Sequence, residues 1–307
     1  LLLRSNFGLD YDSGYHHFYT YTFHSDIVNN DVPKVSTWHA NDLKWNWSNT
    51  AQYTIDFGKE QQHHLTVLGG FELYSQIRYD VEGYAENFAI EDKNYMWLNS
   101  ATGTERAYGG KSGYNLVSFF GKGDYNWNDL LLASFTIRYD GSSRFGKNNR
   151  YGIFPAGSLG YRLSKHIDKE WLDDLKIRAS WGKTGNQAID NYARYTLFSA
   201  DYGDTRETGT AYDLYLQGSG ILPSGYRPYQ SANNDIKWET ATQTNIGFDF
   251  GILGNSIYGS YDYFIKDVED MLIRPGYLGA RGEGGAAWEN GPSVRNWGME
   301  LTVGYRK

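Results

Sequence analysis

Segments with strand-like alternation are joined by connections that are alternately short and long, and this ordering strongly limits the folds open to the chain. Residues 241–250 (ATQTNIGFDF) place apolar side chains mainly on one face and polar or small side chains on the other. The same period of two recurs at 130–140, 175–181 and 299–305. Such a period indicates a β-strand with two unlike faces, so we expect an antiparallel, all-β protein.

Short and long connections alternate along the chain. Short turns are expected at 58–62, 126–129 and 251–256, with a slightly longer one at 165–174. Long connections rich in Gly and Tyr are expected at roughly 85–112, 186–234 and 274–293, and a moderate one at 141–150. Up-and-down barrels of outer membranes have short turns at one rim and long loops at the other. In a soluble β-sandwich, short and long connections are not separated between the two ends in this way. We therefore predict an antiparallel up-and-down transmembrane β-barrel, with about eleven or twelve strands in this chain.

Composition agrees with strands that cross a membrane. The chain has no apolar run long enough for a membrane-spanning helix, and its mean hydropathy is -0.62. A barrel strand needs only about 9–11 residues with one apolar side, so its mean hydropathy resembles that of a water-soluble protein. The chain contains 27 Tyr and 10 Trp, which are residues that suit a membrane–water interface. Five tryptophans near expected strand ends are interpreted as such a girdle: Trp45, Trp47, Trp127, Trp238 and Trp297.

Several stretches, taken in order, resemble the SusC/RagA-like family of TonB-dependent outer-membrane transporters. The strongest is LKIRASWGKTGNQAIDNY at 175–192, preceded by RYDGSSRF at 138–145 and YGIFPAGSLGYRLSK at 151–165. Downstream stand IKWETATQTNIGFDFGIL at 236–253, YDYFIKDVEDMLIRP at 261–275 and NGPSVRNWGMELTVGY at 290–305. Each stretch is common by itself, but their order and spacing follow the family over roughly residues 43–307.

The resemblance implies a barrel of about 22 strands with an N-terminal plug, in the outer membrane of a Gram-negative bacterium. It also implies a SusD-like surface lipoprotein as partner, contact with the TonB complex through an N-terminal region, and an oligosaccharide or peptide as substrate. Because the chain opens without Met and ends on Arg306-Lys307, we expect residues 1–307 to be part of one barrel domain. The plug and the final strands would then lie outside this chain.

Three classes of function are weighed. The first is active, TonB-dependent uptake of glycans or peptides. The second is a passive outer-membrane porin, which would not need the ordered SusC-like stretches. The third is a soluble all-β carbohydrate-binding domain, which would not need detergent.

The sequence offers no pattern typical of an enzyme or of a bound cofactor. Cysteine is absent and the formal charge is -7, which gives no sign of nucleic-acid binding. The acidic pair at 173–174 falls on an expected turn rather than across a substrate. The adjacent pairs His16-His17 and His63-His64 would point to opposite faces of a strand, so neither pair readily binds one metal ion.

Binding residues are expected in the long loops. The 186–234 connection is rich in tyrosine, and aromatic rings stack on sugars and pack against proteins. We select Tyr226, Tyr229 and Trp288 as candidate substrate-binding or partner-binding residues. The Thr184-Gly185-Asn186 segment is interpreted as structural, with Gly relieving steric conflict at a strand exit and Asn tolerating a positive φ.

Overall fold

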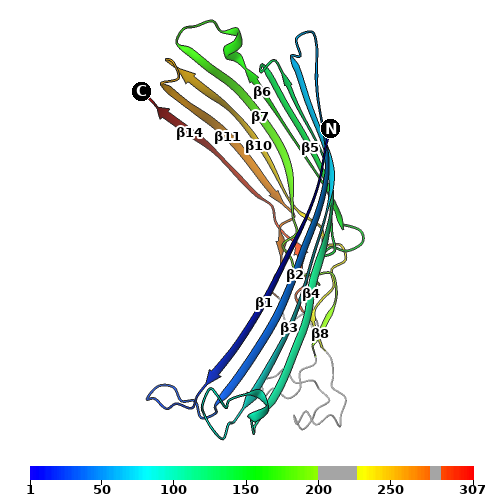
Figure 1. Cartoon of the computed structure of the whole chain (residues 1–307), viewed down its shortest axis with the longest axis vertical. Coiled ribbons are helices and arrows are strands. Elements are labelled where there is room, and N and C mark those ends of the chain that lie inside the picture. Colours follow the sequence, from blue (N-terminus) through cyan, green and yellow to red (C-terminus); the bar gives the residue numbers. More distant parts are fainter. Residues whose placement is uncertain (200–226, 277–284) are drawn as a thin grey trace. The chain divides into compact units, whose positions relative to one another are not determined.

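The computed structural model describes residues 1–199, 227–276 and 285–307. Its main element is an antiparallel sheet in the order β1-β2-β3-β4-β5-β6-β7-β10-β11-β14, so strands adjacent along the chain are paired in space (Figure 1). The sheet comprises β1 (Leu2–Thr20), β2 (Lys34–Phe57), β3 (His63–Glu86), β4 (Glu105–Trp127), β5 (Leu131–Ser142), β6 (Tyr151–Arg162), β7 (Leu172–Asn186), β10 (Glu239–Ile252), β11 (Ile257–Glu269) and β14 (Val294–Tyr305). This confirms the predicted all-β, up-and-down architecture.

Four further strands and two short 3-10 helices lie in the connections. Strands β8 (Leu197–Ser199) and β9 (Arg227–Gln230) form one small sheet, and β12 (Leu272–Ile273) and β13 (Glu289–Asn290) form another. The 3-10 helices are η1 (Leu98–Ser100) and η2 (Leu163–His166). The main sheet therefore has ten strands in the described residues. This is fewer than the expected eleven or twelve, because loop segments with strand-like patterns pair locally instead.

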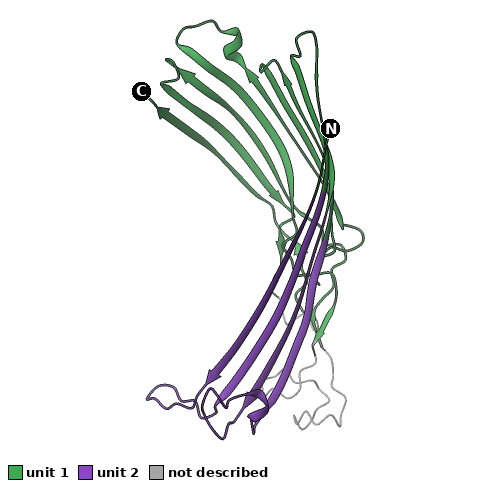
Figure 2. Cartoon of the chain, viewed as in Figure 1, with its two compact units in different colours: residues 1–5, 49–72, 116–307 green, residues 6–48, 73–115 purple. Residues whose placement is uncertain are grey.

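The chain divides into two compact units (Figure 2). Unit 1 contains residues 1–5, 49–72 and 116–307, and unit 2 contains residues 6–48 and 73–115. Unit 2 has its own apolar cluster of Val35, Ala85, Phe88 and Met96. Met96 belongs to the β3–β4 connection, so that connection is anchored to the strands it joins.

The short turns occur at 58–62, 128–130 and 253–256, close to their predicted places. Left-handed backbone conformations explain their residue types. Asn128 and Asp129 have φ values of 50° and 52°, a region that Asn and Asp enter more readily than most residues. The Asn126 amide donates to Asp129 Oδ1 (2.7 Å) and the Asp129 N–H donates to Asn126 Oδ1 (2.9 Å). The turn thus supplies its own hydrogen bonds.

No helix in the described parts of the chain is long and apolar enough to cross a membrane.

Candidate functional site

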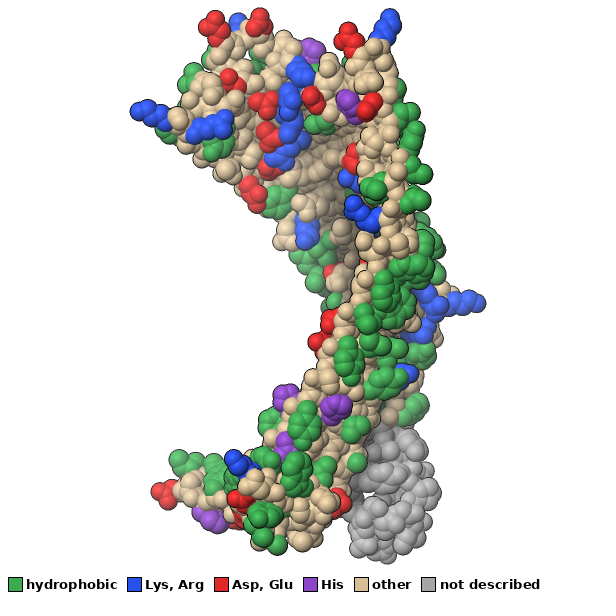
Figure 3. All heavy atoms as spheres, in the orientation of Figure 1, with side chains coloured by type: hydrophobic (Ala, Val, Ile, Leu, Met, Phe, Trp, Pro, Cys, Tyr) green, Lys and Arg blue, Asp and Glu red, His purple; other side chains and the backbone are tan. Residues whose placement is uncertain are grey.

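The sheet of unit 1 has one face covered by large apolar side chains. In cross-strand register, Leu159 lies opposite Ala179, which lies opposite Ile246, which lies opposite Tyr263. The row ends at Met299 on β14. Ile246 is 55% exposed and Met299 is 64% exposed. We call this surface the apolar face. Elsewhere on the surface, Figure 3 shows hydrophobic side chains gathered along the right-hand side of the view.

An exposed row of apolar side chains is typical of a sheet face that contacts lipid or another apolar surface. Single exposed apolar residues are ordinary, but contiguous apolar surfaces on a water-soluble monomer are restricted in size. A soluble sandwich would bury such a face against a second sheet. In the described residues of unit 1, the buried hydrophobic cluster instead lies among connections and strand ends. The apolar face is therefore the surface expected of barrel strands that contact lipid.

The opposite face of the same strands is polar and is called the polar face. Lys176 Nζ lies 2.7 Å from Asp249 Oδ2, and Arg178 Nε lies 3.1 Å from Asp249 Oδ1. Arg178 also contacts Asp262 Oδ2 at 2.6 Å. Two cations and two carboxylates thus form a balanced ionic network across β7, β10 and β11.

A hollow of about 510 Å³ lies beside this network on the polar face. Its floor includes Ser134, Ser158, Ser180 and Asn245, which occupy one cross-strand row. These hydroxyl and amide groups both donate and accept hydrogen bonds. The wall therefore offers neutral polar groups next to charges that are already paired, which suits a hydrated passage.

The buried core of unit 1 is formed largely by the long connections. It contains Phe145, Phe154, Ile189, Ala193, Ile236 and Trp238, with Leu272 and Trp288 packed against it. We call this assembly the loop cluster. Trp238 is therefore a core residue, and its assignment to an interfacial girdle was wrong. Trp45 and Trp47 lie within β2 rather than at its end, while Trp127 is the last residue of β4.

Hydrogen bonds join the connections of the loop cluster to one another. Arg144 Nε donates to Asn191 Oδ1 (2.8 Å), and Arg144 NH1 donates to the Gln187 carbonyl (3.1 Å). The Trp238 indole donates to the Arg150 carbonyl (3.1 Å). Because these bonds cross between connections that are distant in sequence, the loops form a defined surface.

The Thr184-Gly185-Asn186 segment is structural, but for a different reason at Asn186. Asn186 is absent from the residues with positive φ in the described chain. Its amide instead donates to Glu239 Oε1 (3.0 Å), and Glu239 Oε2 accepts the Leu272 N–H (3.0 Å). Gly185 is required by packing, since a side chain there would overlap the Phe154 ring.

The three selected loop aromatics have different surroundings. Tyr226 lies outside the described residues. Tyr229, on β9, is 46% exposed. Trp288 packs against the loop cluster and donates its indole N–H to Asp190 Oδ2 at 3.0 Å. The structure therefore places Tyr229 at the surface and gives Trp288 a packing role.

Two exposed aromatics near Tyr229 were not selected from the sequence. Tyr195 and Phe198 are both exposed, and β8 pairs with β9 so that Phe198 lies opposite Pro228. Gln230 Nε2 holds the segment by donating to the carbonyls of Tyr192 and Tyr195, at 2.9 and 3.0 Å. In the sequence, the pairing of β8 with β9 could have been predicted only from the short strand-like runs on both sides of the long connection.

The paired residues considered for catalysis or metal binding have structural contacts. Asp173 Oδ2 accepts the Asn255 N–H at 2.8 Å, whereas Asp174 accepts from Ser164 at 3.1 Å. His16 packs on Trp38, and His17 packs on Trp97. No group of three or more His, Asp or Glu residues in the described chain is placed to hold a metal ion.

Comparisons with known proteins agree on one family. The family described as TonB dependent receptor-like, beta-barrel, matches residues 2–306. TonB-dependent receptor P3 of Formosa agariphila is 29% identical over 264 residues, covering 84% of this chain and 24% of that protein. TonB-dependent receptor SusC of Bacteroides thetaiotaomicron is 34% identical over 192 residues, covering 61% of this chain and 18% of that protein. The chain thus spans about a quarter or less of these relatives.

Solved structures show the same fold. The structure of the RagAB peptide transporter covers 98% of this chain with a TM-score of 0.82 and 24% identity. This chain corresponds to 32% of that transporter chain.

Proposed function

Because this chain belongs to the TonB dependent receptor-like β-barrel family, we propose that its whole protein actively imports glycans or peptides across an outer membrane. The observation that carries this proposal is the division of the sheet into an apolar face and a polar face. A strand wall with this division separates lipid from a hydrated passage. The resemblance to SusC/RagA-like sequences favours uptake of bulky nutrients over passive diffusion.

The proposed protein is longer than this chain. Its relatives are about four or more times as long as their matched segments, so residues 1–307 supply part of a barrel domain. An N-terminal plug and further strands complete the proposed transporter, and an N-terminal segment contacts the TonB complex. We propose no catalytic role, because the matched relatives are named receptors and transporters.

A SusD-like surface lipoprotein is the proposed partner at the long-loop side. Tyr229, together with Tyr195 and Phe198, supplies an aromatic surface for substrate or partner. Trp288 supports that surface through its contacts with the loop cluster. Tyr226 is also proposed as a binding residue, from its position in the sequence alone.

Energy-dependent uptake distinguishes the proposal from a passive porin. The full-length protein should fractionate with outer membranes, require detergent for extraction, and support uptake of a labelled oligosaccharide or peptide. Uptake should stop when the proton gradient across the inner membrane is collapsed. Uptake that continues unchanged would favour the porin, and extraction without detergent would favour a soluble binding domain.

A further inference from the structure

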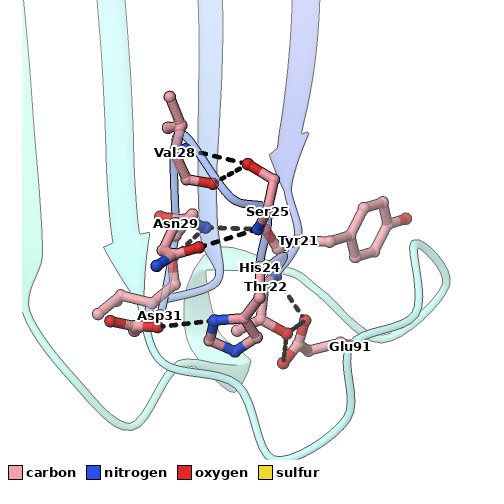
Figure 4. Close-up of polar contacts among 10 residues, drawn as sticks. Tyr21, Thr22, His24, Ser25, Val28, Asn29, Asp31 and Glu91 are labelled. Carbon is pink, nitrogen blue, oxygen red and sulfur yellow. Dashed lines mark hydrogen bonds and ion pairs between the residues drawn. The ribbon is translucent and has the colours of Figure 1, made fainter.

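The β1–β2 connection of unit 2 forms a compact loop that we call the finger, residues 21–31. Its tip is closed by Ser25 (Figure 4). The Ser25 hydroxyl donates to the Val28 carbonyl at 2.6 Å and accepts the Val28 N–H at 2.9 Å. Asn29 Oδ1 accepts the Ser25 N–H at 2.9 Å. The tip is therefore held by its own side chains.

The base of the finger is fixed in two further ways. Phe23 and Asn30 exchange backbone hydrogen bonds of 3.0 and 2.8 Å. The Thr22 N–H donates to Glu91 Oε2 at 2.8 Å, and the Thr22 hydroxyl donates to Glu91 Oε1 at 2.9 Å (Figure 4). Glu91 lies in the β3–β4 connection, so the two loops of unit 2 brace each other.

The braced tip presents apolar side chains to its surroundings. Ile27 is 93% exposed and Val28 is 57% exposed. Phe23 and Ile90, near the base, are also exposed. A loop that is already held in one conformation loses little conformational freedom on binding. An exposed aliphatic side chain on such a loop is therefore suited to act as an interface anchor.

The charge around the tip identifies the kind of surface that the finger fits. Asp26, Asp31, Glu91 and Asp92 are exposed, and Lys93 is the adjoining exposed cation. His24 pairs with Asp31 at 3.5 Å. This acidic surround repels anionic lipid headgroups and attracts a protein surface with basic residues.

We propose that the finger is a docking element whose Ile27–Val28 tip enters an apolar socket, rimmed by basic side chains, on a folded partner protein. The proposal rests on the proposed function in taking the surface lipoprotein as that partner. Insertion of Ile27 into the socket gives the docking its specificity. The acidic side chains around the tip increase the rate of association with the basic rim of the partner.

The test measures the affinity of the full-length transporter, in lipid nanodiscs, for the acyl-free domain of the lipoprotein. Ile27→Glu should weaken binding at least about tenfold, as expected for an interface anchor. Leu253→Glu is the matched control, because Leu253 is an exposed aliphatic residue in the turn between β10 and β11, and it should bind normally. Changing Asp26 and Asp31 to Lys should slow association and reduce its dependence on salt.

A fluorophore attached to Ile27→Cys separates protein docking from lipid contact. Its emission should shift to the blue only after the lipoprotein is added. A blue shift in anionic nanodiscs alone would overturn the proposal, as would wild-type affinity of the Ile27→Glu variant. Absence of binding by the unmodified transporter would reject the lipoprotein partnership itself, and the finger proposal with it.

Discussion

Placing arginine on the apolar face at Ile246 gives the sharpest test of the membrane assignment. The Ile246 side chain is 55% exposed, and its cross-strand neighbours are Ala179 and Tyr263. An arginine there fits without creating a cavity or a clash. In water, such a surface substitution changes stability by no more than about 0.5 kcal/mol. Near the bilayer midplane it costs about 2–4 kcal/mol.

The matched control is Gln243→Arg, on the polar face of the same strand. Gln243 lies opposite Gly182 and Lys266, so an arginine there remains hydrated and meets only modest repulsion. Reversible urea unfolding of the full-length protein in lipid vesicles, followed by tryptophan fluorescence, measures both free energies of unfolding. A cost under about 1 kcal/mol for Ile246→Arg, or an equal loss of stability in both variants, would show that Ile246 does not face lipid.

Three further outcomes are expected. Gly146→Ala should loosen the loop cluster, because the added carbon overlaps the Asn234 carbonyl oxygen, and limited proteolysis should cut the long connections sooner while the strands stay protected. Trp288→Phe should destabilise the same cluster by about 1 kcal/mol through loss of its indole hydrogen bond, and partner affinity should fall with it. The Asn126 amide holds the pKa of Asp129 below its ordinary value of 3.8; the resulting stabilisation is therefore present above pH 3.8 and disappears as pH falls through the lowered pKa. The gap in unfolding free energy between wild type and Asp129→Asn should stay constant above pH 3.8 and narrow only as pH falls through the lowered pKa, which acid titration of both proteins measures.

Local pattern predicted the strands and short turns well, because alternation and turn chemistry are properties of neighbouring residues. The segment 241–250 lies within β10, and 58–62 is the turn between β2 and β3. The role of Trp238 could not be read in this way. Its surroundings come from Phe145 and Phe154, which are remote in sequence, and a tryptophan beside a strand end fits an interface equally well.

The candidate sites show the same limit. Tyr229 is exposed, and its role in binding stays a prediction. The packing of Trp288 depends on Ile189 and other residues of the loop cluster. The finger gave no sequence signal, because its form depends on the bond between Thr22 and Glu91. Single short polar residues such as Ser25 are common in loops and do not reveal which carbonyls they will contact.

The origin of the loop cluster in several connections has a consequence for biogenesis. Phe145 comes from the β5–β6 connection, whereas Ile189 and Ile236 come from the two ends of the β7–β10 connection, so their packing closes large chain loops. Contacts of this kind form late, after the hairpins that bring them together. Burial of Trp238 should therefore follow strand pairing during refolding, as a separate slow phase of tryptophan fluorescence. Until that phase ends, the long connections would carry unpacked aromatic segments open to added protease.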